Sequence, residues 1–336
     1  MTDANVPRLK KSELRIKLGT INASTLREKE EELVEVMGMR GLDVLALAET
    51  RLKGRDDRTI HENHRLISSG KDGGRHGVAF LLNENIASCV EQVKQVNERI
   101  IGLDLKLETG VSLIQVYAPQ QGRPAAEKEE FYRLMQQTMD EMKYQQNTVI
   151  CGDLNGHIGR NRVGYKNIIG AHSIGERNVE GQRILDFATA NNLSVMNTYF
   201  QHRDSQKWTW YRYNHQVQAY TQKSMIDMYM TNNKALFLDV KSVPSCSMDA
   251  DHRLVMANIR MKKPGRRKMA GVKRYKLGKL REPETKDKLK RAIEEKCGRE
   301  SGEGETEVLW SAFKRKLVEA ANEILGEKNP TEGKRR

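Results

Sequence analysis

The sequence predicts an α/β fold in which two β-sheets pack face to face and helices cover their outer faces. Two observations lead to this prediction. Residues 13–261 contain many apolar segments of strand length, interspersed with only a few segments of helical periodicity. The apolar segments are also short, which is typical of strands buried between a second sheet and covering helices.

A strand, a helix and a second strand are expected first along the chain. Residues 14–21 alternate apolar and polar side chains, as a half-buried strand does. A helix is expected from Thr25 onward, with Gly41 as its stop. One face of this helix is formed by Leu26, Leu33, Val36 and Met37. Residues 43–49 then form an apolar run of strand length.

Two further helices are expected in the domain, over residues 125–143 and 181–192. The first has an apolar face formed by Phe131, Leu134, Met135, Thr138 and Met142. The remaining strand-like segments are 76–83, 100–107, 111–118, 148–152, 193–197, 207–212, 224–230, 238–243 and 254–261.

Charge divides the chain unevenly. The 336 residues carry a formal net charge of +13, and residues 262–300 hold 16 Lys or Arg against 6 Asp or Glu. The earlier residues are nearly balanced, with 35 basic and 32 acidic side chains. A basic excess favours a polyanionic partner. The predicted organisation is a loose lead over 1–12, a domain over 13–261, a basic linker over 262–280, and a helical extension with a flexible end over 281–336.

Several protein classes are excluded by the composition. No apolar run reaches the roughly 18 residues of a membrane span, and the first residues contain no apolar signal-peptide core. The four cysteines lack paired spacing, which argues against a disulfide framework or a cysteine zinc site and favours a reducing compartment.

Polar residues recur where the predicted strands end. Asn22, Glu49, Tyr117, Asp153 and Asn155 follow apolar runs, Asp227 interrupts one, and Asp251 and His252 precede one. Strand ends at one edge of a sheet pair can converge on a single cleft. A cluster of carboxylate and amide oxygens there would suit a hard divalent cation.

Taken singly, these residues also have structural interpretations. Glu49 is equally compatible with a solvated strand end, and Asp153 and Asn155 in GDLNG suit a turn. Tyr117 suits a core aromatic with a satisfied hydroxyl. Asp227 is harder to explain structurally, because an unpaired carboxylate within an apolar strand is unfavourable and requires a partner.

Taken together and in order, the segments resemble the endonuclease/exonuclease/phosphatase superfamily, which includes exonuclease III and apurinic endonucleases. The matching pieces span residues 14–261 and are GTINAST, LALAETRL, HGVAFLLN, VYAP, CGDLNGHIG, KWTW, MIDMYM and DADHRLV. These motifs are also similar to those of the endonuclease domain of RTE-type non-LTR retrotransposons and of the host-encoded craniofacial development protein 2-like family. The resemblance departs from the superfamily pattern at Ile21, Leu154, Met228 and Ala250.

The resemblance implies a four-layer α/β sandwich that hydrolyses phosphodiester bonds with Mg²⁺ or Mn²⁺ to give 3′-hydroxyl and 5′-phosphate ends. Glu49 would be the main metal ligand, aided by Asn22 and Asp251. Asp153 would be the general base and Asn155 would help to hold the water. His252, oriented by Asp227, and Tyr117 would contact the phosphate.

DNA is the partner that the resemblance implies, and a nuclear location follows from that substrate. The protein is expected to be a monomer. The residues expected at the DNA, each also compatible with a surface or packing role, are Arg51, Lys53, Arg75, Trp208, Trp210, Arg212 and Arg253. Three alternatives remain open: a phosphatase of the same fold, an abasic-site repair enzyme, and a non-catalytic chromatin or nucleic-acid-binding protein derived from a captured nuclease.

Overall fold

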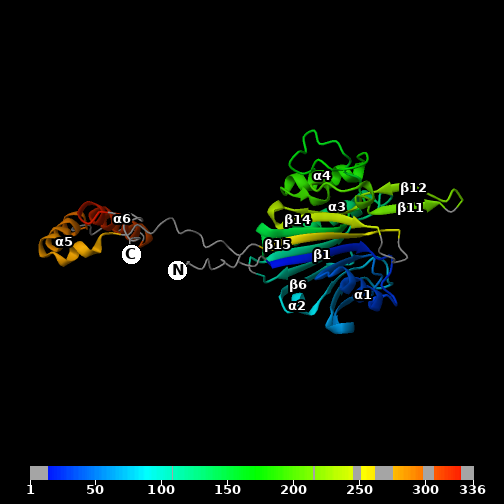
Figure 1. Cartoon of the computed structure of the whole chain (residues 1–336), viewed down its shortest axis with the longest axis horizontal. Helices are drawn as coiled ribbons and strands as arrows, with labels where there is room; N and C mark the ends of the chain where they lie inside the picture. Colours follow the sequence, from blue (N-terminus) through cyan, green and yellow to red (C-terminus); the bar gives the residue numbers. More distant parts are fainter. Residues whose placement is uncertain are drawn as a thin grey trace, which may run out of the picture. The chain divides into compact units, whose positions relative to one another are not determined.

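A computed structural model describes residues 14–107, 109–214, 216–244, 251–261, 275–297 and 306–326, without the side chains of Cys297 and of residues 306–312. The chain divides into two compact units, residues 1–264 and 265–336 (Figure 1). Within the described residues, no helix is long and apolar enough to cross a membrane.

Two mixed β-sheets form the centre of the first unit. In spatial order, the seven-stranded sheet contains β14 (Phe237–Val243), β15 (Leu254–Met261), β1 (Leu14–Asn22), β2 (Val44–Ala48), β5 (Val78–Leu82), β4 (Arg65–Ser69) and β3 (Arg55–Thr59). The six-stranded sheet contains β10 (Ser194–Val195), β13 (Asp227–Thr231), β9 (Thr148–Asp153), β8 (Val111–Tyr117), β7 (Ile100–Leu105) and β6 (Val90–Asn97).

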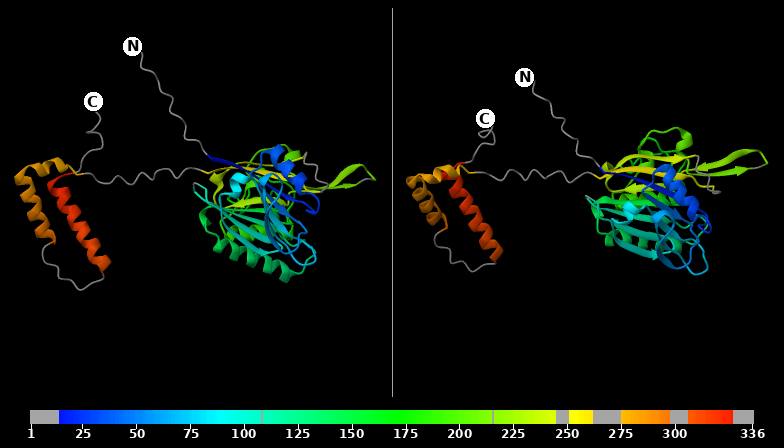
Figure 2. Two further views of the ribbon diagram at one scale, coloured as in Figure 1. Left: turned by 90° about the horizontal axis from the view of Figure 1, so that it is seen from below. Right: turned by 60° about the horizontal axis from the view of Figure 1, so that its bottom comes forward.

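Helices cover the outer face of each sheet, which gives the four layers visible in Figures 1 and 2. Helix α1 (Glu30–Arg40) packs on the seven-stranded sheet, and α3 (Ala125–Glu141) and α4 (Val179–Ala190) pack on the six-stranded sheet. The short α2 (Glu84–Ala87) follows β5. The predicted fold class, two packed sheets flanked by helices, is confirmed.

Strand β2 illustrates why its segment is apolar throughout. Val44, Ala46 and Ala48 point into the core between the sheets, while Leu45 and Leu47 point toward α1. Successive side chains point to opposite faces of the sheet, and because both faces are buried, all of them are apolar.

Several element boundaries differ from the sequence expectations. Helix α1 begins at Glu30 rather than near Thr25, and Leu26 reaches the same apolar core from the preceding loop. It ends as expected at Gly41, whose φ of 61° suits a left-handed cap. The segment 224–230 is not one strand, because Ser224 ends one strand and Asp227 begins the next.

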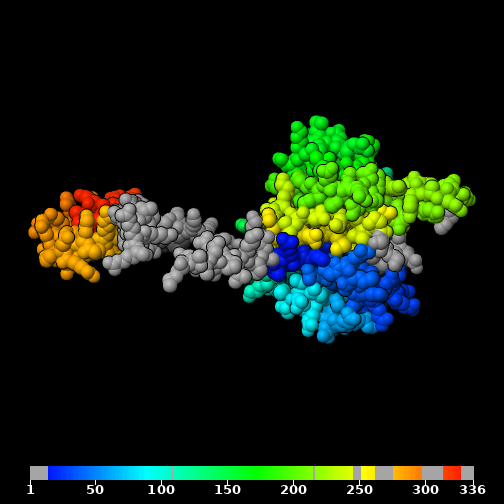
Figure 3. All heavy atoms as spheres, viewed as in Figure 1, coloured from blue at the N-terminus to red at the C-terminus, as the bar shows by residue number. Residues whose placement is uncertain are grey.

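The prediction of a strand over 207–212 is also wrong in its start. The strand β11 (Trp210–Asn214) pairs with β12 (Ala219–Ser224) in a separate two-stranded ribbon. Trp208 precedes β11, so strand alternation does not place Trp208 and Trp210 on one face. The ribbon stands out from the body of the unit (Figure 3).

The second unit contains α5 (Pro283–Cys297) and α6 (Thr306–Ile324), which pack on each other. Ala320 and Leu325 are buried there, and Lys296 pairs with Glu323 at 3.1 Å. Both helices lie within the region over 281–336 where a helical extension was expected. Most of the predicted basic linker lies outside the described residues.

Candidate active site

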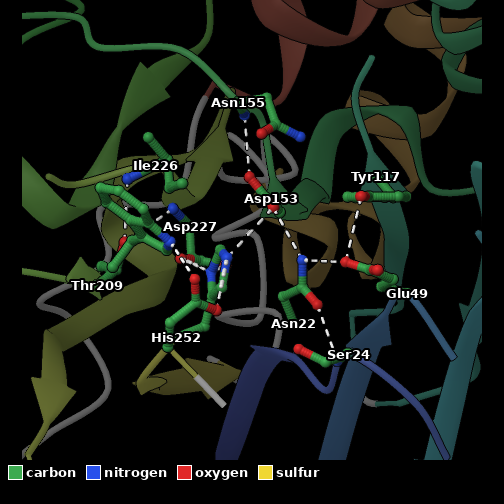
Figure 4. Close-up of polar contacts among 12 residues, drawn as sticks. Asn22, Ser24, Glu49, Tyr117, Asp153, Asn155, Thr209, Ile226, Asp227 and His252 are labelled. Carbon is green, nitrogen blue, oxygen red and sulfur yellow. Dashed lines mark hydrogen bonds and ion pairs between the residues drawn. The ribbon is translucent and has the colours of Figure 1, made fainter. Parts of the chain in front are cut away.

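Strands from both sheets end at one edge of the first unit and bring the predicted polar residues together. The parallel pairs β1/β2 and β8/β9 end there at their carboxyl termini. Strands β13 and β15 start there, because each runs antiparallel to its neighbour. Residues far apart in the sequence therefore meet in one cluster, drawn in Figure 4.

Asn22 links the two sheets at this edge. Its Nδ2 donates to Glu49 Oε2 at 3.2 Å and to Asp153 Oδ2 at 3.1 Å (Figure 4). Its Oδ1 accepts the backbone N–H of Ser24 at 3.0 Å. Glu49 also accepts the Tyr117 hydroxyl at 3.2 Å on the same oxygen and Arg51 Nη2 at 2.9 Å on the other. The Glu49 carboxylate is thus held by donors on three sides.

Asp153 is the last residue of β9 and is almost fully buried. Its Oδ1 accepts the backbone N–H of Asn155 at 3.0 Å. Asn155 turns its own amide away to the Ala118 carbonyl, at 2.8 Å. The Asp153 carboxylate therefore keeps one orientation, with Asn22 on one oxygen and the Asn155 backbone on the other.

His252 forms the other wall of the cluster. Its Nδ1 lies 2.9 Å from Asp227 Oδ2, and its Nε2 lies 3.8 Å from Asp153 Oδ2 (Figure 4). The hydroxyl of Thr209 accepts the backbone N–H groups of Ile226 and Asp227, each at 3.0 Å, and so fixes the start of β13. Asp227 orients the imidazole so that Nε2 faces Asp153.

Asp251 lies beside this pair but is more exposed. Its Oδ2 accepts the indole N–H of Trp210 at 2.7 Å, and its Oδ1 lies 4.0 Å from His252 Nε2. Backbone hydrogen bonds join Tyr211 to Asp251 and Arg253 to Thr209. These contacts attach the base of the β11–β12 ribbon to the segment that carries His252.

The pKa values of three residues in the cluster differ from those of the same groups in water. Burial and then the charge of Asp227 raise the pKa of Asp153 to about 7. Burial alone would lower the pKa of His252, but the charge and hydrogen bond of Asp227 outweigh it and raise that pKa to about 10. Burial and the charge of Glu49 raise the pKa of Tyr117, which keeps its hydroxyl protonated as a donor.

Backbone strain also concentrates at this edge. Glu49, Arg51, His76 and Asn155 have φ values of 54°, 55°, 64° and 48°, in the left-handed region that side chains with a Cβ seldom adopt. Such residues cost about 1–3 kcal/mol each and gather at functional sites.

The cluster borders a cavity of about 360 Å³ lined by Glu49, Asp153, Asn155, Trp210, Asp251 and His252. Asp153, Asp227 and His252 each offer one ligand atom within 4.8 Å of the others, so this group could hold a metal ion. However, Nδ1 of His252 and Asp227 already satisfy each other. The oxygen donors of Glu49, Asp251 and Asn22, which line the cavity, form a harder set and fit a cation such as Mg²⁺ better.

Comparisons with known proteins found relatives of the sequence and of the fold. No family model matches the sequence. Craniofacial development protein 2 of Tragulus javanicus is 24% identical over 252 residues, which cover 73% of this chain and 42% of that protein. The corresponding protein of Bos taurus is also 24% identical over 252 residues, which cover 41% of its length. The chain thus spans less than half the length of the curated relatives it matches.

Solved structures decide the fold. The 3′-5′ exonuclease NExo of Neisseria meningitidis aligns with a TM-score of 0.53 at 17% identity, over 73% of this chain and all of that one. An AP endonuclease from Archaeoglobus fulgidus aligns with a TM-score of 0.52 at 16% identity, over 72% of this chain and 98% of that one. The chain has the endonuclease/exonuclease/phosphatase fold. Its predicted resemblance to this superfamily and to craniofacial development protein 2 is confirmed.

The structure gathers the predicted catalytic and metal-binding residues at one edge of the first unit (Figure 4), whereas their individual roles stay predictions. The residues expected at DNA are more dispersed. Arg51 and Arg75 line a second cavity of about 310 Å³ that shares Glu49 with the first. Lys53 is exposed and lines neither cavity.

The remaining predicted DNA contacts lie on or near the ribbon. Trp210 lines the first cavity, and Trp208 is half-buried. The exposed Arg212 has its guanidinium carbon 6.0 Å from the Trp210 ring centroid. Arg253 instead packs over Tyr211 and donates to the Ser205 carbonyl, which leaves it less available to a phosphate.

Two residues that support the cluster were not predicted from the sequence. Thr209 is fully buried and fixes Asp227, but a threonine between two tryptophans carries no chemical signal in a sequence. Arg99 is buried beside Tyr117, and only its place one residue before an apolar strand distinguishes it in the sequence. Contacts between distant segments, which a sequence does not display, give both residues their significance.

Proposed function

We propose that this domain is a divalent-cation-dependent DNA endonuclease that leaves 3′-hydroxyl and 5′-phosphate ends. The observation that carries the proposal is the buried Asp153, which faces a His252–Asp227 pair across 3.8 Å while Glu49 is held beside it through Asn22. A base, an acid and an oxygen-rich cation site at one cavity are the parts that phosphodiester hydrolysis requires.

Glu49 would hold the cation, with Asp251 and the remaining lone pair of Asn22 Oδ1 as further donors. A bound Mg²⁺ or Mn²⁺ supplies Lewis-acid stabilisation of the phosphate charge and of the leaving oxygen. The existing contacts suit this role, because Asn22, Tyr117 and Arg51 fix the Glu49 carboxylate before any cation arrives.

Asp153 would accept the proton of the attacking water. Its pKa of about 7 lies near neutral pH, where a general base combines a deprotonated fraction with useful basicity. Asn22 and the Asn155 backbone hold both carboxylate oxygens, which limits the directions from which water can approach.

His252 would donate from Nε2 to a non-bridging phosphate oxygen. Asp227 holds Nδ1 and keeps the imidazole protonated, since the pKa of His252 is about 10. The positive charge then faces the place where negative charge grows during the reaction. Tyr117 would reach the same phosphate from the Glu49 side of the cavity.

Arg51 and Arg75 in the adjacent cavity, together with Trp210 and Arg212 at the ribbon, would contact the DNA strands. We further propose a nuclear site of action, which follows from the substrate, and an origin in a non-LTR retrotransposon, which rests on the motif wording of the chain.

Defined duplexes provide the test. Purified full-length protein would be incubated with matched intact and abasic duplexes in Mg²⁺ or EDTA, and the cut ends would be mapped at nucleotide resolution. We expect Mg²⁺-dependent cuts with 3′-hydroxyl and 5′-phosphate ends, abolished by Glu49→Gln and retained by the exposed control Arg133→Lys. Binding of the duplex without cleavage, or phosphate release alone, would reject the endonuclease and favour a binding protein or a phosphatase.

A further inference from the structure

Arg99 occupies an unusual position for an arginine. It lies in the turn between β6 and β7 and is only 6% exposed. The side chain of Asn97 accepts the backbone N–H of Arg99 at 2.9 Å, which fixes the turn. A buried guanidinium requires nearby acceptors, and its partners reveal what it holds.

Tyr117 is the first of these partners and is contacted at three points. Arg99 Nη1 donates to the Tyr117 carbonyl at 3.1 Å, and the Tyr117 N–H donates to the Arg99 carbonyl at 2.9 Å. The guanidinium carbon also lies 5.4 Å from the centroid of the tyrosine ring. Arg99 therefore determines both the backbone position and the ring position at the end of β8.

Glu127, in the first turn of α3, anchors the guanidinium from the other side. Arg99 Nη2 donates to Glu127 Oε1 at 2.6 Å, and Arg123 Nε donates to Oε2 at 2.8 Å. Arg99 Nη2 also lies 3.4 Å from His76 Nε2, and the His76 ring is tilted against Tyr117 with centroids 5.7 Å apart. The arginine thus connects a helix, a turn and the catalytic tyrosine.

We propose that Arg99 is a positioning residue that sets the affinity of Glu49 for a divalent cation through Tyr117. The Tyr117 hydroxyl donates to Glu49 at 3.2 Å (Figure 4), so displacement of the ring removes one of the donors that orient this carboxylate. A planar fork is required, because one nitrogen holds Tyr117 while the other holds Glu127. The inference rests on the proposed function, since Glu49 is a cation ligand only in that proposal.

The inference is tested by measuring the affinity of the full-length protein for Mn²⁺ without DNA, with electron paramagnetic resonance as the readout. Arg99→Lys keeps the charge but lacks the fork, and we expect it to weaken Mn²⁺ binding by about 10–100-fold, as loss of a group that supports a metal ligand does. Arg133→Lys is the matched control, since Arg133 is an exposed arginine that pairs with Glu130 at 2.7 Å. It should bind Mn²⁺ as the wild type does.

A double-mutant cycle separates positioning from general support of the fold. Tyr117→Phe removes the hydroxyl that reaches Glu49, so Arg99→Lys should cause little further loss of Mn²⁺ affinity in that background. If the two losses multiply instead, Arg99 does not act through Tyr117 and the inference is wrong. A fall in melting temperature with unchanged Mn²⁺ affinity would likewise reduce Arg99 to a structural residue.

Glu127→Gln provides a second variant if Arg99→Lys fails to fold. It weakens the anchor of the guanidinium at a more exposed position, and we expect a smaller loss of Mn²⁺ affinity in the same direction. Unchanged affinity in this variant would then overturn the inference. If the wild type neither binds Mn²⁺ nor cuts DNA, the proposed function is wrong as well. If the wild type does both and Arg99→Lys binds Mn²⁺ with the same affinity, only this inference is wrong.

Discussion

Gly152 allows the sharpest test of how the edge that carries the polar cluster is built. It precedes Asp153 in β9, has a φ of 132°, and a Cβ at this position would lie 2.0 Å from the Val116 carbonyl of β8. Gly152→Ala must therefore separate two paired strands. The unfavourable φ costs about 1–3 kcal/mol, and the overpacking costs about 1–3 kcal/mol.

We expect Gly152→Ala to lower the free energy of unfolding by about 2–6 kcal/mol in equilibrium urea denaturation. For a domain of this size, the melting temperature would fall by roughly 4–24 °C. Gly175→Ala is the control, because Gly175 also has a positive φ, of 74°, but no atom lies within 4 Å of its Cβ position. It should lose only about 1–2 kcal/mol. Equal losses in the two variants would refute the argument from the close approach of β8.

Three further predictions concern buried charges and the DNA. Lys128→Met should lower the free energy of unfolding by at most about 3–5 kcal/mol in urea, because the buried Glu180 loses Lys128 Nζ at 2.6 Å and keeps only Arg183, at 3.7 Å. Because the pKa of His252 is raised from 6.5 to about 10 on folding, the stability that its protonation contributes is complete below pH 6.5 and is lost as the pH rises toward 10. In EDTA the urea midpoint should thus fall over this range, and less so in Asp227→Asn; parallel curves would contradict the assignment. Arg75→Ala should weaken duplex binding and reduce the slope of log affinity against log salt by about 1 in a fluorescence titration, and an unchanged slope would exclude a phosphate contact.

The sequence predicted the strands whose apolar residues form a clear pattern, either continuous as in β2 or alternating as in β15. The expected strand over 254–261 coincides with β15, and the end of α1 at Gly41 is confirmed. Strand β3 was not predicted, because RDDRT is polar and mostly exposed and pairs only with β4 at the edge of its sheet. Edge strands rely on backbone pairing, which leaves little signal in residue type.

The site was predictable as a list of residues but not as a geometry. Each carboxylate stands out because it lies at or next to one end of an apolar strand, and the order of the strands brings these ends together. The hydrogen bond from Asn22 to Asp153 joins residues 131 positions apart, so no local pattern encodes it. The contact of Asp251 with Trp210 is equally hidden, because it depends on where the ribbon base meets the strand that follows.

Nicking of supercoiled plasmid measures the central claim most directly. Full-length protein should convert the plasmid to nicked circles in Mg²⁺ and leave it intact in EDTA. Asp153→Asn removes the base with little change of shape, and we expect the rate to fall by about 10²–10⁴-fold. Arg133→Lys should nick like the wild type. A wild type that nicks equally well in EDTA, or an Asp153→Asn variant that nicks at the wild-type rate, would contradict metal-dependent hydrolysis at this cluster.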